Sequence, residues 1–259
     1  MGPVFCYRLN QLIAVGSFAE VWQAHQVNAD GEPCAADVAL KIGRCHFDDE
    51  TSQREYQMLF YSAQQLDGFI QVLDVTRYHD KLVVAWELAE DNLLGIARNG
   101  LSDVECVRYI GEVAAALDSL HARDFRGRRL FHAGVNPTDI LIHDGHAKLA
   151  DLSPYPIGPP TNIPFYKVVC MAPELRSQPL PKLLPQSDQY ALAATYAWVR
   201  LPNGAFAMPR RGELLGAIEI ARLPHPEKQV LSKAFSVQPE DRFPSCCAFA
   251  DALKEAIQG

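Results

Sequence analysis

A polar loop between two apolar strands constrains the fold of this chain more than any other stretch. Residues 131–142 read FHAGVNPTDILI, in which an apolar run breaks at His132, passes through a turn at Pro137 and resumes at Ile140. Shortly afterwards, the sequence KLAD ends a second short apolar strand at Asp151. An Asp-Gly pair between the two strands is typical of a tight hairpin. The pattern predicts a polar loop, then a hairpin that ends at a carboxylate.

The composition is that of a globular chain rather than a membrane-spanning or nucleic-acid-binding one. The chain has 259 residues, of which 48% are hydrophobic and 21% charged, which suits one domain or one two-lobed unit. The net charge of -7 disfavours non-specific nucleic-acid binding, which requires basic surface. The longest apolar run, Tyr190–Val199, is about half of the roughly 20 residues that a membrane span needs. We therefore expect a cytoplasmic protein without a membrane span.

The cysteines indicate neither a disulfide framework nor a metal site. The chain has 7 cysteines, and none are spaced as the C-x-x-C pairs that are typical of zinc sites. Cys246 and Cys247 are adjacent at the start of an expected helix. Reduced cysteines with a structural role are expected.

Two features near the N-terminus bear on phosphate binding. Gly16 separates two strand-like segments within Leu12–Trp22, and by itself it indicates a hairpin more readily than a phosphate-binding loop. Lys41 interrupts the apolar strand Val38–Ile42. Since an ammonium group is costly to bury unpaired, Lys41 is expected to reach a polar partner.

The next segment predicts one helix and a strand hairpin. Residues 48–65 have helical periodicity and include Glu55, whose simplest interpretation is a solvated charge on an amphipathic helix. Strands are expected over Phe69–Arg77 and Lys81–Glu87. The second strand includes Trp86, which is either a core residue or the wall of a pocket.

From Asp91 onward the expected elements are helices, interrupted by one long loop. Half of the 18 prolines lie between residues 152 and 185, which excludes regular helix or central strand there. That loop ends at the sequence MAPE, which closes at Glu174. Helices are expected over Ser102–Ala122, which opens with a capping box, over Ser187–Trp198, and over Ser245–Ile257.

In this order, the features resemble those of the protein-kinase family, in particular bacterial Ser/Thr protein kinases of the eukaryotic type. The loop 131–142 resembles the catalytic loop H-R-D-L-x-x-x-N, Asp151 the Asp of D-F-G, and the sequence MAPE the A-P-E motif. The resemblance covers nearly the whole chain. It implies an α+β, bilobal protein-kinase fold. A small antiparallel-sheet N-lobe with one helix (1–88) would precede a mostly helical C-lobe (89–259).

The resemblance also implies a scaffold for the loop and a partly retained nucleotide site. Asp188 would hold the loop backbone, and Arg242 would pair with Glu174. Ala14 and Ala19 replace two glycines of the phosphate loop, so ATP is expected to bind weakly. The family pattern assigns nucleotide contacts to Gly16, Val21, Lys41, Glu55, Glu87 and Ala89, and contacts with Mg²⁺ or Mn²⁺ to Asp139 and Asp151.

The positions that transfer phosphate in the family have lost their chemistry here. The family's Arg, Asp, Lys and Thr are replaced by Ala133, Gly134, Asn136 and Lys167, while His132 remains. Gly134 cannot accept a proton, and Asn136 cannot neutralise a transferred phosphoryl group.

The resemblance therefore implies a pseudokinase that acts as a signalling, scaffolding or regulatory module and binds protein partners. One alternative stays open: an atypical ATP-dependent kinase, or a nucleotide-transferring enzyme, that uses Lys41, Asp139 and Asp151. Asp139 stands where the family has Asn, and a carboxylate can still bind a hard cation.

Overall fold

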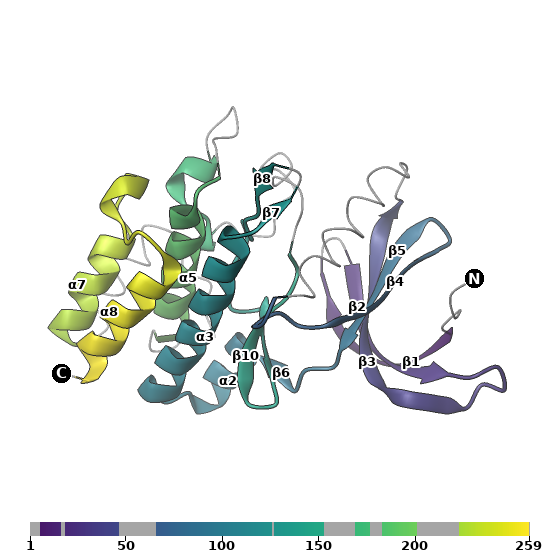
Figure 1. Cartoon of the computed structure of the whole chain (residues 1–259). Coiled ribbons are helices and arrows are strands. Elements are labelled where there is room, and N and C mark those ends of the chain that lie inside the picture. Colours follow the sequence, from purple (N-terminus) through teal and green to yellow (C-terminus); the bar gives the residue numbers. More distant parts are fainter. Residues whose placement is uncertain are drawn as a thin grey trace. The chain divides into compact units, whose positions relative to one another are not determined.

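The computed structural model describes residues 6–16, 19–46, 66–125, 127–152, 169–176, 183–200 and 223–258. These residues form two compact units, one built on a β-sheet and the other mainly on helices (Figure 1). The sheet unit includes Ile70–Ala89, and the helical unit includes Leu66–Phe69 and the described residues from Glu90 onward. The predicted α+β class is confirmed.

The first unit is a five-stranded antiparallel sheet with the strand order β1-β2-β3-β5-β4. Alternate side chains on the central strands form one apolar cluster, as the period of two in a strand requires. That cluster consists of Ala24, Val38, Leu40, Val83 and Ala85. The strands are β1 (Cys6–Val15), β2 (Ala19–Val27), β3 (Pro33–His46), β4 (Val72–Tyr78) and β5 (Lys81–Glu87).

The second unit combines two small sheets with a group of helices. The strands are β6 (Asp91–Asn92), β7 (Asp124–Phe125), β8 (Arg128–Arg129), β9 (Ile140–His143) and β10 (His146–Leu149), with β10-β9-β6 forming one sheet. The α-helices are α2 (Leu93–Gly100), α3 (Asp103–His121), α5 (Pro185–Arg200), α7 (His225–Ala234) and α8 (Cys246–Gln258). Two 3₁₀ turns complete it: η2 (Pro173–Arg176) and η3 (Pro239–Asp241).

Leu66–Phe69 pack with the helical unit although they precede β4 in the sequence. The carbonyl of Gly68 accepts a hydrogen bond from Leu149 N–H at 2.8 Å, and Phe69 forms a parallel β-bridge with Leu149. Gly68 has a φ of +83°, and a Cβ there would lie 2.7 Å from the Cβ of Ala116. The predicted strand Phe69–Arg77 is therefore wrong at its beginning, and β4 begins at Val72.

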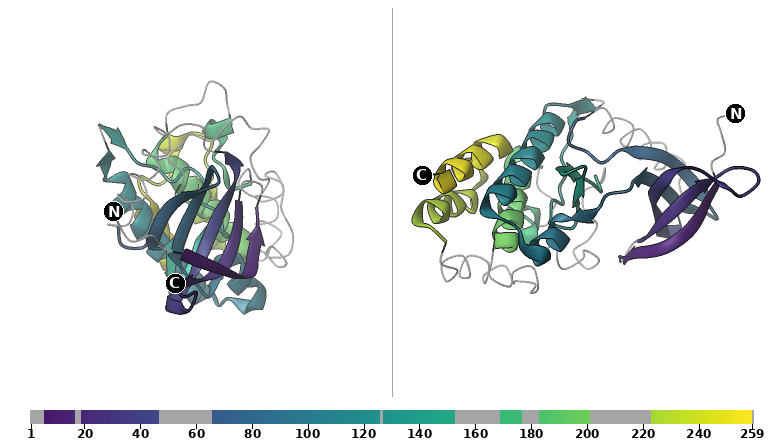
Figure 2. Two further views of the ribbon diagram at one scale, coloured as in Figure 1. Left: turned by 90° about the vertical axis from the view of Figure 1, so that its right-hand side faces the viewer. Right: turned by 90° about the horizontal axis from the view of Figure 1, so that it is seen from below.

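The helix α5 is the centre of the helical unit. Every residue from Ser187 to Trp198 is buried, as its nearly continuous apolar sequence predicts. The helices α3, α7 and α8 pack against it, and α8 also packs against α3 and α7 (Figure 2). The loop that resembles a catalytic loop therefore lies in a unit whose central helix is buried from Ser187 to Trp198.

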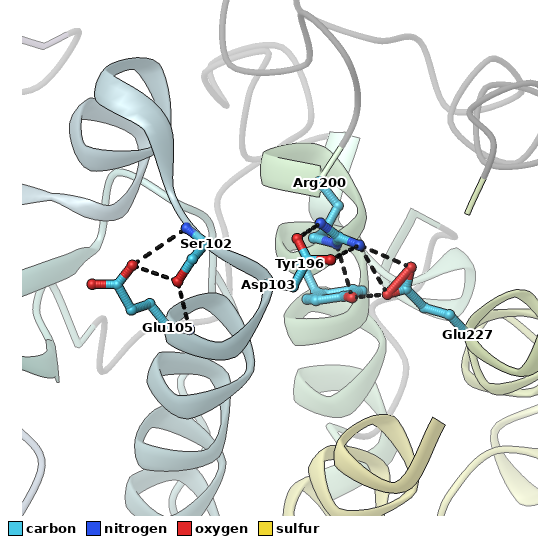
Figure 3. Close-up of polar contacts among 6 residues, drawn as sticks. All are labelled: Ser102, Asp103, Glu105, Tyr196, Arg200 and Glu227. Carbon is cyan, nitrogen blue, oxygen red and sulfur yellow. Dashed lines mark hydrogen bonds and ion pairs between the residues drawn. The ribbon is translucent and has the colours of Figure 1, made fainter. Parts of the chain in front are cut away.

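Polar contacts fix the beginning of α3 and join three of the helices (Figure 3). Ser102 and Glu105 form the predicted capping box at the beginning of α3. Glu227 of α7 is fully buried and accepts hydrogen bonds from Tyr196 Oη and, at 3.3 Å, from Arg200 Nη2 on α5. Arg200 also pairs with Asp103 of α3. Because a buried carboxylate is costly unless paired, this network stabilises one arrangement of the three helices.

None of the helices in the described part of the chain is both long enough and apolar enough to cross a membrane.

Candidate functional site

Asp188, near the beginning of α5, holds the loop after Phe131 through its carboxylate. Its Oδ2 accepts a hydrogen bond from His132 N–H at 2.9 Å, and its Oδ1 accepts one from Ala133 N–H at 2.8 Å. The ring nitrogen Nε2 of His121 lies 2.8 Å from Oδ2. Asp188 is only 1% exposed, and hydrogen bonds to a charged group are strong when water is excluded. The prediction that Asp188 holds the loop backbone is confirmed. We call Asp188, His121, His132 and the Ala133 amide the loop anchor.

The loop anchor stabilises an unfavourable backbone conformation. Ala133 has a φ of 58°, in the left-handed region that favours glycine and costs other residues roughly 1–3 kcal/mol. The hydrogen bond from its backbone amide to Asp188 holds it in this conformation. The family pattern marked Ala133 only as a lost Arg, whereas here its backbone has a structural role.

His132 joins the loop to the strand that leads to Asp151. Its ring Nε2 lies 2.9 Å from the carbonyl oxygen of Ala150. The amide of Ala150 in turn donates to the carbonyl oxygen of Asp139 at 2.8 Å. The two segments that carry the expected metal ligands, Asp139 and Asp151, are therefore hydrogen-bonded to each other.

Asn136 makes as many side-chain hydrogen bonds as its amide group allows. Its Nδ2 donates to the carbonyl of Gly134 at 2.9 Å and to Asp139 Oδ2 at 2.6 Å. Its Oδ1 accepts from Thr138 N–H at 3.0 Å and from Thr138 Oγ1 at 2.6 Å. An asparagine side chain offers two donors and two acceptor positions, and the residue is 0% exposed. We call Asn136, Thr138, Asp139 and the Gly134 carbonyl the Asn136 cluster.

The family carries its catalytic Lys at the position of Asn136. In this chain, the Asn136 cluster uses that position to hold the loop together by hydrogen bonds. An outward turn of Asn136 would leave the buried Asp139 and the partly buried Thr138 without these bonds, at roughly 1–3 kcal/mol for each buried group left unsatisfied. Gly134, at the position of the catalytic base, contributes only its carbonyl.

The donor set of Asp139 and Asp151 suits a hard cation. Mg²⁺ and Mn²⁺ prefer carboxylate oxygens, and these two residues supply them. Asp151 has a φ of 60°, which Asp tolerates better than most residues. However, Asp139 Oδ2 already accepts the bond from Asn136, and the residue is 8% exposed. A cation on this oxygen would compete with the Asn136 amide.

In the sheet unit, Gly16 begins the turn between β1 and β2. Its amide donates to the carbonyl of Ala19 at 2.8 Å, and a Cβ at Gly16 would lie 3.3 Å from that oxygen. Val21 of β2 pairs with Ala14 of β1. The predicted hairpin around Gly16 is confirmed, while its contact with nucleotide stays a prediction.

Lys41 of β3 lies against an aromatic ring. Its Nζ is 5.2 Å from the ring centroid of Trp86 on β5, within the range of a cation–π interaction. Trp86 is 5% exposed. Trp86 is thus both a core residue and a contact of the lysine, a pairing that the sequence alone did not predict.

Two further expected nucleotide positions lie at the end of β5. Glu87 is hydrogen-bonded to Gln71 by its own amide and through its side chain, both at 3.0 Å. Ala89 follows the strand and is half-buried. Glu55 and Lys167 lie outside the residues that the structure describes.

The expected pair Glu174–Arg242 is present. Arg242 Nη1 donates to Glu174 Oε1 and Nη2 to Oε2, each at 2.8 Å. Arg242 also donates to the carbonyls of Gln186, Ser236 and Val237. Burial alone would raise the pKa of Glu174, but the bonds from Arg242 and Ser187 outweigh it and lower that pKa. The pair ties η2 to the segment before α8.

Comparison with known proteins agrees with this geometry. No family model matches the chain. The serine/threonine-protein kinase PknF of Mycobacterium tuberculosis is 32% identical over 182 residues, which cover 62% of this chain and 37% of that protein. The serine/threonine-protein kinase PknI of Mycobacterium bovis is 32% identical over 162 residues, covering 58% of this chain and 24% of the relative. This chain thus matches only about a third or less of these relatives' lengths.

The solved structures extend the similarity to nearly the whole chain. The crystal structure of the M. tuberculosis PknI kinase domain has a TM-score of 0.69 and 26% identity, and covers 98% of each chain. The chain is similar to proteins of the protein kinase-like superfamily. It has the bilobal protein-kinase fold that the sequence predicts. The matches name kinases, and the state of the transfer positions here must be judged from this kinase-like domain's own residues.

Two residues of this site were not predicted from the sequence. Thr138 supplies both bonds to Asn136 Oδ1; the run Asn-Pro-Thr-Asp does signal such a turn, because Asn side chains often accept from the backbone two residues on. His121 contacts Asp188 from α3. Its place at the end of a helix gave no sign of this contact.

Proposed function

We propose that this chain is a pseudokinase, a kinase-like module that binds protein partners, holds ATP weakly and does not transfer its phosphate. The observation that carries the proposal is the Asn136 cluster. All the hydrogen-bonding capacity of Asn136 is used within the loop, at the position where an active kinase places a charge next to the transferred phosphoryl group.

The missing groups act on one chemical step. Gly134 has no side chain to accept the proton of a substrate hydroxyl, and general-base assistance contributes about 10²–10⁴-fold. Asn136 supplies no positive charge, although preorganised electrostatics usually contribute more to catalysis than any other single effect. Since no described contact compensates for either loss, we expect no useful rate of transfer to a hydroxyl.

The proposal of weak ATP binding rests on the residues retained for it. Lys41 would contact the phosphates, with Glu55 as its expected partner, and Asp139 and Asp151 would hold Mg²⁺ or Mn²⁺. ATP, when bound, would supply the phosphoryl group. Two contacts oppose tight binding: the ring of Trp86 against Lys41, and the Asn136 amide on Asp139.

The alternative of an atypical ATP-dependent enzyme is favoured by one observation. Asp139 and Asp151 lie on segments joined through Ala150, so two carboxylates for a cation are retained. Such an enzyme would need its acceptor activated by a group other than the residue at position 134.

A thermal-shift titration tests nucleotide binding. At a hundred times its dissociation constant, a ligand that binds only the folded state stabilises it by about 2.7 kcal/mol. For a domain of this size, that is a rise of several degrees in Tm, at roughly 2–4 °C per kcal/mol. We expect this rise with Mg²⁺-ATP and its loss in Lys41→Ala. An equal shift in Lys41→Ala, or none at millimolar ATP, would contradict the nucleotide site.

A radiolabel assay separates the two candidate functions. The unmodified chain is incubated with labelled ATP, Mg²⁺ or Mn²⁺, and protein or peptide acceptors. We expect no transfer above that of Asp151→Ala. Robust transfer that Asp151→Ala abolishes would establish the atypical enzyme and overturn the pseudokinase proposal.

A further inference from the structure

Three potential metal ligands meet where α3 lies against the beginning of α8. Asp118 and His121 are on α3, and Cys246 is the first residue of α8. One ligand atom from each lies within 4.8 Å of the other two. The Nδ1 of His121 is 3.8 Å from Asp118 Oδ1. Both His121 and Cys246 are buried, at 6% and 0% exposure.

A second observation indicates that this cluster is incomplete. The Nδ1 of His121 is buried and has no hydrogen-bond partner among the described residues, while the other ring nitrogen is bonded to Asp188. A buried polar atom without a partner in a native structure calls for an explanation, and an ion is one of the usual ones. Nδ1 is the atom of the ring that faces Asp118.

We propose that Asp118, His121 and Cys246 bind one thiophilic divalent cation, with Zn²⁺ as the best fit. Imidazole nitrogen, thiolate and carboxylate are all zinc ligands, at about 2.0–2.3 Å. Such bond lengths in a tetrahedral site separate neighbouring ligand atoms by roughly 3.3–3.8 Å. The 3.8 Å between Nδ1 and Oδ1 already lies at the edge of that range.

The surroundings orient two of the three ligands, His121 and Asp118, by hydrogen bonds of the kind that support metal ligands. Asp188 accepts from Nε2 of His121, which leaves Nδ1 for the metal in the carboxylate–histidine–metal arrangement. The two oxygens of Asp118 accept from the amides of Cys246 and Cys247, each at 2.9 Å. Cys247 is partly exposed, so the fourth position can be filled by water from that side.

A divalent cation at this cluster would have to displace protons from its ligands. A coordinating metal would remove the proton of the Cys246 thiol. The charge of the cation would offset the negative charges of the Cys246 thiolate and the Asp118 carboxylate, with His121 neutral. A proton on Nδ1 of His121, which faces Asp118 Oδ1 at 3.8 Å, is the competitor of the cation.

The proposed ion would join three parts of the helical unit. It would link α3 to α8 directly and, through His121 and Asp188, would stabilise the loop anchor. The sequence gave no sign of it, because Cys246 is far along the chain from the other two ligands and no C-x-x-C spacing marks it. The proposal is independent of the pseudokinase proposal, since none of its ligands belongs to the transfer or nucleotide positions.

Cobalt spectroscopy on the full chain tests the site. Cys6, Cys34, Cys45 and Cys247 are first replaced by Ser, which leaves the buried thiols of Cys106, Cys170 and Cys246, and metal is removed by chelation. We expect one equivalent of Co²⁺ to give a sulfur-to-cobalt charge-transfer band that Zn²⁺ displaces and excess Mg²⁺ does not. Zn²⁺ should also raise Tm. Binding should strengthen with pH, because the metal displaces protons.

Substitutions make the test specific. Cys246→Ala should lose the band and weaken Zn²⁺ binding by at least about tenfold, given that even supporting residues change affinity 10–100-fold. Asp118→Asn, which keeps an acceptor for α8, should weaken it too. Cys170→Ala, which removes a buried thiol elsewhere, should keep the band. Absence of the band, or an equal band in Cys246→Ala, would overturn the proposal.

Discussion

The loop anchor and the Asn136 cluster hold neighbouring parts of one loop, and they differ in what they retain of a kinase. The loop anchor has the expected arrangement, with Asp188 bonded to two consecutive backbone amides. The Asn136 cluster occupies the positions of base, lysine and metal ligand with a different set of groups, and these bond mainly to one another.

The difference shows which requirements a fold imposes and which a reaction imposes. Holding a backbone amide requires a buried acceptor at the right distance, and the backbone is the same whatever side chains follow. Transferring a phosphoryl group requires particular side chains at Gly134 and Asn136. A loop can therefore keep its path after losing its chemistry, provided that its new polar groups satisfy one another, as Asn136 and Thr138 do.

The largest expected effect comes from removing the loop anchor. Asp188→Ala leaves the amides of His132 and Ala133 and the ring of His121 without an acceptor. At roughly 1–3 kcal/mol for each unsatisfied buried group, we expect a loss of about 3–5 kcal/mol in the free energy of unfolding, measured with urea. The matched control, Asp251→Ala on the exposed side of α8, should change it by less than about 0.5 kcal/mol. Similar losses in both would refute the role of the loop anchor.

The pair Glu174–Arg242 should have the next largest effect, and it should depend on pH. Glu174→Gln leaves the buried Arg242 charge without its carboxylate, at about 3 kcal/mol near neutral pH. The pKa of Glu174 is lowered in the folded state, so its stabilisation is present above its ordinary pKa and lost as pH falls through the folded value. The difference between wild type and variant should therefore shrink below about pH 4. A difference independent of pH would argue against the ion pair.

Much of the architecture could be predicted because it follows from local patterns. The capping box at Ser102 and the apolar sequence of Ser187–Trp198 each specify a helix through short-range chemistry. Asp188 and the Glu174–Arg242 pair came from the family pattern, which places a residue without giving its other contacts.

The unpredicted parts depend on contacts between distant segments. The sequence predicts that Phe69 lies in a strand of the sheet unit, yet Phe69 forms a β-bridge with Leu149 in the helical unit. The contact of Lys41 with Trp86 needs the register of β3 against β5. The four hydrogen bonds of the Asn136 side chain require the folded conformation of the loop. Neither periodicity nor motif spacing encodes such contacts.

Beside the loop anchor, the buried amide of Gln189 is left unsatisfied and offers a gain in stability. Gln189 is 0% exposed, and its Oε1 and Nε2 have no hydrogen-bond partner in the described part of the chain. Gln189→Met keeps a similar shape without the amide, and should raise the free energy of unfolding by about 1–3 kcal/mol. Urea denaturation measures this, with Gln238→Met at an exposed position as the control. A loss of stability in Gln189→Met would indicate that the amide has a partner, such as a buried water.

The smallest expected effect lies within the Asn136 cluster. Thr138→Val keeps the branched shape but removes the hydroxyl that donates to Asn136 Oδ1. We expect a loss of about 0.5–1.5 kcal/mol, typical of one hydrogen bond. Thr76→Val, at an exposed position on β4, is the matched control. An equal free energy of unfolding in the two variants would mean that the Asn136 cluster does not stabilise the folded conformation of the loop.

Restoring the missing side chains tests the central claim that the loop is folded as in a kinase but lacks its chemistry. Radiolabel transfer to a peptide is compared among the unmodified chain, Gly134→Asp, and Gly134→Asp combined with Asn136→Lys and Lys167→Thr. We expect no transfer by the unmodified chain, little from the single variant and more from the triple variant, with Asp151→Ala abolishing it. Recovery by Gly134→Asp alone to roughly 1–100 per second, the range of active kinases, would contradict the account, because Asn136 would then be no obstacle to catalysis.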